Sequence, residues 1–177
     1  DGDGVTDCAD PDCFGDPNCI DQGSCLPIDV LQCPSGFINS SNGAPGNTNQ
    51  VTDWCGNGFD GWTGPEVAYI FLPASSGTVQ LSLEGLDAHL DMTVLLAEPG
   101  GPDGATCNPD LCVADAWEPG PNPEYLEFEA FAGQPYIIAI DGWQGAVSDF
   151  ILFMECGGQF FEQDCADNLD NDGDAST

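Results

Sequence analysis

Hydrophobic and polar residues alternate along several stretches in the middle of the chain. In residues 78–84, TVQLSLE, the apolar side chains Val79, Leu81 and Leu83 are separated by polar ones. A period of two between turn residues is typical of a half-buried strand. This alternation, or a short apolar run bounded by glycine or proline, predicts six strands at residues 67–72, 78–84, 90–97, 124–131, 135–142 and 148–155.

No stretch shows the sustained period of an amphipathic helix, and the chain contains 23 Gly and 14 Pro, which favour turns. The predicted fold is therefore all-β, an antiparallel β-sandwich of jelly-roll type. Residues 99–123 are rich in Pro and Gly and are expected to form one long loop. The ends of the chain are expected to be irregular and held by disulfides and calcium.

Composition divides the 177 residues into three regions. Residues 1–24 consist mainly of Asp, Gly, Pro and Cys and are predicted to be a calcium-binding linker. Residues 25–156 contain nearly all the hydrophobic residues and are predicted to be the sandwich domain. Residues 157–177 return to acidic composition and are predicted to be a second linker that completes the 1–24 region of a following copy.

The charge of the chain excludes several functions. There are 31 Asp and Glu residues and no Lys or Arg, which gives a formal net charge of -31. Nucleic-acid binding requires a basic face, and so does binding to anionic lipid. No apolar span is long enough to insert into a membrane as a helix. Cations from solution must balance the acidic groups, since no internal ion pair with Lys or Arg can form.

No catalytic constellation stands out, and the chain is predicted not to be an enzyme. A Schiff-base Lys and an Arg clamp are absent from the sequence, and the lone His89 has no marked Ser to form a triad with. Carboxylates are plentiful, but no two of them stand out as a glycosidase pair. His89 is expected to be a surface residue of a turn or strand.

The ten cysteines predict disulfides and an extracellular location. The sequence has no Cys-x-x-Cys pair and only one His, so zinc binding is disfavoured. Disulfides persist in oxidising compartments. Sequence alone cannot fix their connectivity, and the pairs we predict are Cys107–Cys112, Cys13–Cys19, Cys33–Cys55, Cys25–Cys156 and, between consecutive copies, Cys165–Cys8. Asn39-Ser40-Ser41 is a candidate site of glycan attachment.

Residues 25–156 resemble the bacterial pre-peptidase C-terminal type of domain in its Cys-rich variety. The motifs occur in the family's order: Gly64–Tyr69 (GPEVAY), Leu90-Asp91-Met92, Ala132–Ile137 (AGQPYI) and Ile140-Asp141-Gly142. His89 departs from the pattern because the family commonly has Asp there. The resemblance implies a β-sandwich appendage of secreted enzymes or surface proteins, and it implies no catalytic residues.

The two ends resemble the Asp-rich calcium repeats of thrombospondin type 3 and the loops of EF-hands. Alternate Asp residues on a tight, glycine-punctuated loop present oxygens to one centre, as Ca²⁺ requires. The N-terminal run lacks a good ligand at its first position, and the C-terminal run of a preceding copy supplies the continuation. The predicted calcium ligands are Asp1, Asp3, the Val5 carbonyl, Asp7, Asp10 and Asp12 at one end, and Asp170, Asp172 and Asp174 at the other.

Both ends contain Asp-Cys-Ala-Asp, at residues 7–10 and 164–167, which suggests one period of a repeating structure. The predicted function is therefore a structural module of an extracellular, calcium-stabilised filament or tandem-repeat surface protein, whose partners are copies of itself joined head to tail. The alternative is a non-catalytic carbohydrate- or protein-binding accessory domain of a secreted enzyme. The four Trp residues either cover the sandwich or stack against sugar rings.

Overall fold

A computed structural model describes residues 27–33, 36–44, 47, 51, 53–56, 61–97 and 107–157. These residues form nine strands and one short 3-10 turn. The strands are β1 Pro27–Leu31, β2 Gly36–Ser41, β3 Trp62–Phe71, β4 Gly77–Glu84, β5 Leu90–Leu96, β6 Cys112–Ala116, β7 Glu124–Ala130, β8 Tyr136–Trp143 and β9 Asp149–Cys156, and the turn is η3 Pro109–Leu111.

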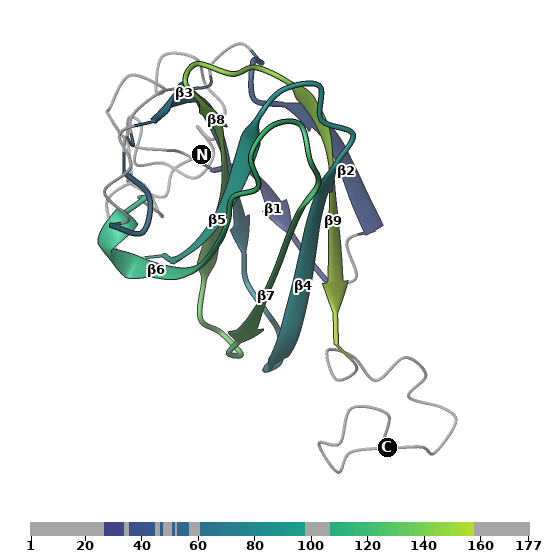
Figure 1. Cartoon of the computed structure of the whole chain (residues 1–177). Coiled ribbons are helices and arrows are strands. Elements are labelled where there is room, and N and C mark those ends of the chain that lie inside the picture. Colours follow the sequence, from purple (N-terminus) through teal and green to yellow (C-terminus); the bar gives the residue numbers. More distant parts are fainter. Residues whose placement is uncertain are drawn as a thin grey trace, which may run out of the picture.

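The strands form two sheets that pack face to face as a β-sandwich (Figure 1). One sheet has five strands in the order β1-β3-β8-β5-β6, and the other has four in the order β2-β9-β4-β7. All neighbouring strands are antiparallel except β1 and β3, which are parallel. The predicted fold class is thus confirmed, with a mixed sheet where an antiparallel one was expected.

All six predicted strands are present, and three further strands were not predicted. β1 and β2 have only short apolar segments, and β2 has partly or fully exposed residues throughout. β6 lies inside the Pro/Gly-rich region 99–123 that was expected to be a loop. It pairs with β5 and is itself an edge strand of the five-stranded sheet. Backbone hydrogen bonding to β5 therefore stabilises this strand, although its hydrophobic pattern is weak.

The main core fills the space between the sheets. It contains side chains from both inner faces, including Phe71, Val79, Leu83, Ile138 and Leu152, all nearly inaccessible to solvent. A second apolar cluster lies on the opposite side of the five-stranded sheet, where Val51 and Trp54 pack over Ala68, Ile137 and Ala139 together with Trp62, Leu95 and Ala97. The sandwich therefore has two outer faces of different character.

We call the outward side of the five-stranded sheet the covered face, because the segment around Trp54 packs on it. We call the outward side of the four-stranded sheet the bare face. In β8 the residues Tyr136–Asp141 are all buried, as expected for a strand covered on both sides. In β7 buried and exposed residues alternate from Glu124 to Ala130, as expected for a strand with one side in water.

Candidate functional site

The bare face carries a transverse row of aromatic side chains. Ser82 of β4 is paired with Tyr125 of β7 on one side and with Phe153 of β9 on the other, and Phe153 is paired with Phe37 of β2. We call the three aromatic residues, together with Ser82 between Tyr125 and Phe153, the aromatic row. Tyr125 and Phe37 are 65% and 60% exposed, and Phe153 is half-buried. The row crosses all four strands and presents ring surface on three of them, with Ser82 on the fourth.

The two ends of the row differ in spacing. The rings of Phe37 and Phe153 lie next to each other, with centroids 5.9 Å apart and planes at 47°. Tyr125 and Phe153 are separated by one strand, which corresponds to about 10 Å at the usual strand spacing of about 4.8 Å. The small Ser82 lies between them and leaves the space above β4 open.

A row of hydrogen-bonding groups runs beside the aromatic row. Gln80 of β4 pairs with Glu127 on β7 and with Glu155 on β9. The Gln80 side-chain amide donates to Glu127 Oε2 at 2.7 Å. The Ser82 hydroxyl donates to Glu84 Oε1 at 3.3 Å. Because carboxylates only accept hydrogen bonds when ionised, this part of the face can receive several donors from a ligand.

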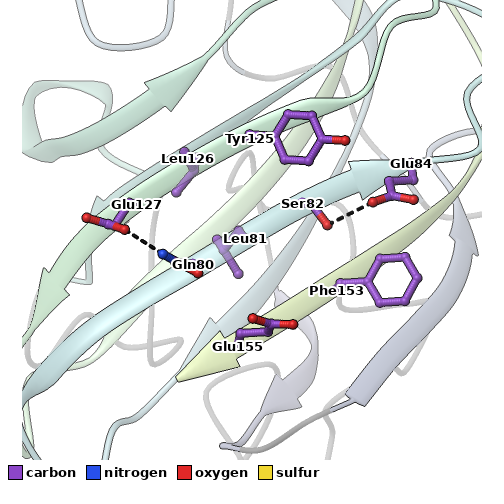
Figure 2. Close-up of a pocket in the computed structure, with 9 residues that line it drawn as sticks. All are labelled: Gln80, Leu81, Ser82, Glu84, Tyr125, Leu126, Glu127, Phe153 and Glu155. Carbon is purple, nitrogen blue, oxygen red and sulfur yellow. Dashed lines mark hydrogen bonds between the residues drawn. The ribbon is translucent and has the colours of Figure 1, made fainter. Parts of the chain in front are cut away.

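The two rows enclose a groove of about 600 Å³. Figure 2 shows the nine residues that line it: Gln80, Leu81, Ser82, Glu84, Tyr125, Leu126, Glu127, Phe153 and Glu155. A smaller hollow of about 360 Å³ lies farther along the same sheet, near Asn39 and Ile151. The groove is open to solvent and is not an enclosed cavity, so it suits a ligand that lies on the sheet.

Sequence reasoning did not select the groove residues. It assigned Gln80, Ser82 and Glu84 to the outward side of residues 78–84, and the register confirms that side. The exposed tyrosine of residues 124–131 was a usable signal, because a large aromatic at an outward position of an alternating strand is unusual. The meeting of Tyr125, Ser82 and Phe153 was not visible, since it depends on strand order.

The predicted calcium ligands at both ends lie outside the described residues. Among the described residues, one group of three metal-ligating side chains has its donor atoms within 4.8 Å of one another, and it consists of Cys55, Cys112 and Asp115. Its two sulfurs are bonded to each other in a disulfide, so neither can act as a thiolate ligand. This group is therefore not a metal centre. The predicted glycan acceptor Asn39 is exposed in β2, on the bare face.

The structure corrects the predicted disulfides of the sandwich. Cys33 pairs with Cys156, and Cys55 pairs with Cys112, with Cα atoms 6.0 and 5.0 Å apart. The predicted pairs Cys33–Cys55, Cys25–Cys156 and Cys107–Cys112 are therefore wrong. Cys107 is disulfide-bonded, and its partner is not among the described cysteines. The predicted pairs Cys13–Cys19 and Cys165–Cys8 lie outside the described residues.

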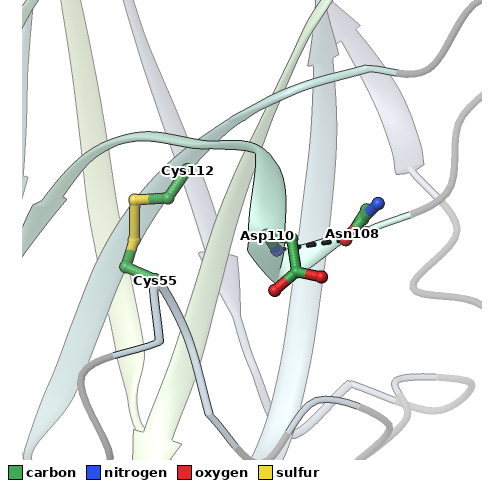
Figure 3. Close-up of a disulfide and its surroundings, with 4 residues drawn as sticks. All are labelled: Cys55, Asn108, Asp110 and Cys112. Atoms are coloured by element: carbon green, nitrogen blue, oxygen red, sulfur yellow. Dashed lines mark hydrogen bonds between the residues drawn. A yellow bond between two sulfur atoms is a disulfide. The ribbon is translucent and has the colours of Figure 1, made fainter.

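Strand order explains the observed pairs. The β2–β9 register places the residues just before Gly36 beside the end of β9, so Cys33 meets Cys156 there. Cys112 begins β6, directly after η3, and faces Cys55 of the covering segment (Figure 3). Asn108 caps η3 by accepting from the Asp110 amide at 3.0 Å. This disulfide therefore fastens the covering segment to the edge of the five-stranded sheet.

The tryptophans mostly cover the sandwich. Trp54 and Trp62 are buried, and Trp143 is half-buried with its ring 5.5 Å from that of Trp62 in an edge-on contact. Trp117 is 52% exposed. His89 was expected at the surface but is half-buried, and its Nε2 lies 3.0 Å from Asp91 Oδ1. Its ring also packs 5.8 Å from that of Trp143.

Comparison with known proteins does not assign the chain to a family. No protein-family model matches the chain, and no curated protein matches it. Within the described part of the chain, no helix has the length and apolar character needed to cross a membrane.

Solved structures similar to this chain include the following three. The pre-peptidase C-terminal domain of a Bacillus anthracis collagenase is 12% identical, with a TM-score of 0.45, covering 73% of this chain and 93% of that one. PliG, a periplasmic inhibitor of g-type lysozyme from Aeromonas hydrophila, is 12% identical, with a TM-score of 0.43 and coverage of 74% and 96%. CorA, a surface-associated copper-binding protein of Methylomicrobium album BG8, is 9% identical, with a TM-score of 0.48 and coverage of 74% and 98%.

Proposed function

We propose that this chain is a secreted, non-catalytic module that binds a neutral polysaccharide across the bare face. The observation that carries the proposal is the aromatic row, in which Tyr125, Phe153 and Phe37 extend over four strands beside a groove. Exposed aromatic rings on a rigid sheet give apolar contact area at a low cost in conformational entropy. The disulfides of the domain favour an oxidising, extracellular compartment.

The chemistry of the groove matches that of a sugar chain. A pyranose ring has an apolar face of C–H groups that can lie on Tyr125 or Phe153, and hydroxyl groups around its edge. Those hydroxyls can donate to the carboxylates of Glu84, Glu127 and Glu155, which line the same groove. Hydrogen bonds to charged acceptors are stronger than those between neutral groups. The open groove suits the middle of an extended chain better than its end.

The net charge limits which polymers can bind. With a formal charge of -31 and no basic residue, the chain repels anionic polysaccharides, nucleic acids and anionic lipid surfaces. A neutral chain pays no such cost. Calcium at the two Asp-rich ends is part of this proposal as a stabiliser of the linkers, and the ligands are the terminal Asp residues predicted from the sequence.

The proposal can be tested by affinity electrophoresis of the full chain in gels that contain neutral polysaccharides: β-glucan, galactomannan, xylan or hydroxyethylcellulose. At least one should retard the protein, whereas anionic polygalacturonate should not. Tyr125→Ala and Phe153→Ala should each weaken binding roughly tenfold, which corresponds to about 1.4 kcal/mol. Phe131→Ala is a matched control because Phe131 is similarly exposed, at 62%, and lies just beyond the end of β7, about 20 Å from Tyr125 at about 3.4 Å per residue.

Three outcomes would contradict the proposal. One is the absence of retardation by any neutral polysaccharide. A second is that Tyr125→Ala and Phe131→Ala weaken polysaccharide binding equally, which would show that binding does not depend on the aromatic row. A third is release of reducing sugar by the purified protein, which would make the module an enzyme.

A second candidate function is a module of a calcium-stabilised extracellular fibre, joined head to tail to copies of itself. The observation that favours it is the repeated Asp-Cys-Ala-Asp at residues 7–10 and 164–167. In this case Cys165 of one copy bonds Cys8 of the next, and calcium bridges the acidic ends, so the heterologous contact propagates. Electron microscopy of native material should show filaments that EDTA and reductant together disperse. A protein that stays monomeric in millimolar Ca²⁺ would exclude this candidate.

A further inference from the structure

Three buried carboxylates form a row across the covered face. Asp141 of β8 is the register partner of Glu66 on β3 and of Asp91 on β5. We call these three residues the carboxylate row. Their exposed fractions are 2%, 2% and 1%, so the row is removed from solvent. Adjacent residues in an antiparallel sheet have Cβ atoms about 4.5–5.5 Å apart, so neighbouring carboxylates in the row are close.

Two of the three carboxylates have an oxygen without a hydrogen-bond partner among the described residues. Asp141 Oδ2 accepts from the Trp54 indole N–H at 2.7 Å, and Asp91 Oδ1 lies 3.0 Å from His89 Nε2. The remaining oxygens, Asp141 Oδ1 and Asp91 Oδ2, are buried and unpartnered. Buried polar atoms are nearly always satisfied in native proteins, so these two oxygens call for a ligand.

The chain itself provides no cation for the row. It contains no Lys or Arg, and its single His is the neighbour of Asp91. Burial lowers the pKa of His89, which disfavours a positive charge on this ring. An ionised carboxylate that is buried without a counter-charge is strongly unfavourable. The row therefore needs either protons or an ion from solution.

We propose that Asp91 and Asp141 together bind a divalent cation of the hard, oxygen-preferring class, Ca²⁺ in an extracellular setting. The two free oxygens come from adjacent strands at one register position, and each carboxylate is already oriented by a second bond, to His89 and to Trp54 respectively. Outer partners of this kind orient metal ligands in known sites. The proposed ligands are other residues than the calcium ligands predicted at the acidic ends, and the proposal is independent of the polysaccharide proposal.

The type of ion follows from the ligands. The row offers only carboxylate oxygens, which suit Ca²⁺ and Mg²⁺ rather than zinc or copper. The carboxylates lie in a line rather than around a cage, so two of them hold the ion and water or main-chain oxygens complete its shell. Ca²⁺ accepts such flexible coordination more readily than Mg²⁺, which requires near-octahedral geometry. Glu66 Oε2 accepts from the Val51 amide at 3.1 Å and flanks the pair.

Two further observations are consistent with this assignment. Burial, with smaller contributions from Glu124 and Asp141, raises the pKa of Asp91 to about 8. Burial, opposed by the Trp54 hydrogen bond and assisted by Glu66, raises the pKa of Asp141 to about 7. In the absence of a cation, burial favours the protonated carboxyls, so a cation would compete with protons for these two groups.

The indole N–H of Trp54 offers a local probe, because it donates to Asp141. In two-dimensional ¹H–¹⁵N spectra of the full chain, its signal is assigned by its absence in Trp54→Phe. Addition of CaCl₂ to the chelator-treated protein should shift this signal with saturation. Asp91→Asn and Asp141→Asn should each weaken that response about 100-fold or abolish it, given that loss of outer partners alone costs about 10–100-fold. Asp149→Asn, at an exposed position of β9, is the matched control and should change the response less than about twofold.

A second measurement separates this site from calcium at the acidic ends, which all variants share. The rise in Tm on going from EDTA to CaCl₂ should be larger for the wild type and Asp149→Asn than for Asp91→Asn. Because Asn is uncharged and similar in size, Asp91→Asn should remain folded in EDTA. Equal rises in Tm for all three proteins, or a Trp54 signal that does not respond to CaCl₂, would show that the row holds protons only and would overturn the proposal.

Discussion

The bare face and the covered face are the two outer sides of one sandwich, but they differ in which side chains they carry and in how far these are exposed. On the bare face, Tyr125 is 65% exposed at a position where β7 alternates strictly between buried and exposed residues. On the covered face, Asp141 is 2% exposed within a strand that is buried on both sides. Aromatic rings thus face water on one side, whereas carboxylates are enclosed on the other.

The two faces differ because different parts of the chain form them. In the part of the chain that the structure describes, the bare face is formed by the sheet alone, so its side chains can serve a ligand. The covered face is completed by Val51 and Trp54, which are held in place by the Cys55–Cys112 disulfide. Enclosure of acidic groups under this segment requires a compensating ion or proton. We therefore expect changes on the covered face to alter stability, and changes on the bare face to alter binding.

The largest expected effect on the free energy of unfolding comes from loss of an aromatic ring on the covered face, compared with loss of one on the bare face. Trp54→Ala removes a ring that is 1% exposed together with its hydrogen bond to Asp141, and it should lower the free energy of unfolding by about 3–5 kcal/mol. Tyr125→Ala removes an exposed ring and should change it by less than about 0.5 kcal/mol. Urea denaturation of both variants measures this. Similar losses for the two would erase the distinction between the faces.

Loss of the disulfide that holds the covering segment should have the next largest effect. The double variant Cys55→Ser/Cys112→Ser should lower the free energy of unfolding by roughly 2–4 kcal/mol, because the bond restricts the unfolded chain over a separation of 57 residues. Polysaccharide retardation of the folded variant should stay unchanged, since the bare face is on the other sheet. A variant that keeps full stability but loses binding would contradict the comparison.

The response to pH should come from buried carboxyls: Asp91 and Asp141 on the covered face, and Glu124 of β7, whose pKa burial raises to about 7. In the metal-free protein, burial raises the folded-state pKa of Asp91 to about 8 and of Asp141 to about 7, above their ordinary value of 3.8. The stability contributed by their protons is fully present below about pH 4 and is lost as pH rises to about 8. The slope approaches about 1.4 kcal/mol per pH unit for each group within that window.

Urea denaturation in EDTA at several pH values checks this slope. Glu124 and Glu66 are the other acidic groups that act on the pair. Asp91→Asn should flatten the slope, and CaCl₂ should restore stability to the wild type at pH 8. A metal-free wild type whose stability rises from pH 5 to pH 8 would contradict the account, because the sign would then be opposite.

The smallest expected effect on stability is at the edge of the groove. Gln80→Ala removes the exposed hydrogen bond to Glu127 and should change the free energy of unfolding by no more than about 0.5 kcal/mol. Binding of the polysaccharide should nevertheless weaken measurably in affinity electrophoresis, because Gln80 lines the groove. The counterpart Thr78→Ala loses a similar bond to Glu129 outside that lining and should leave binding unchanged.

Much of the fold could be predicted from the alternation of apolar and polar residues, because a half-buried strand has apolar residues at every second position. Residues 78–84 and 124–131 show that period, and β4 and β7 match them closely. β6 was missed because it is a partly exposed edge strand next to η3, so its pattern is weak. The disulfide pairs were missed for a related reason. Cys33 and Cys156 are 123 residues apart and meet only through the pairing of β2 with β9.

The candidate sites were predicted less well, because both depend on register between distant strands. Glu66, Asp91 and Asp141 are separated by 25 and 50 positions in the sequence, and none of them belongs to a recognisable metal motif. Their alignment follows from the order β3-β8-β5 in one sheet. The aromatic row similarly requires β7, β4, β9 and β2 to be neighbours. Composition could indicate that cations must bind somewhere, but not at which positions.

The measurement that tests the central claim most directly is a map of backbone amide shifts in the full chain on addition of a neutral β-1,4-linked hexasaccharide of glucose, mannose, xylose or N-acetylglucosamine. The hexasaccharide is matched to the polysaccharide that retards the protein most. The largest shifts should lie on β7, β4 and β9 around Tyr125, Ser82 and Phe153, while the Trp54 indole signal stays in place. Shifts concentrated on the covered face, or no shifts at saturating sugar, would contradict the claim that the bare face is the binding face.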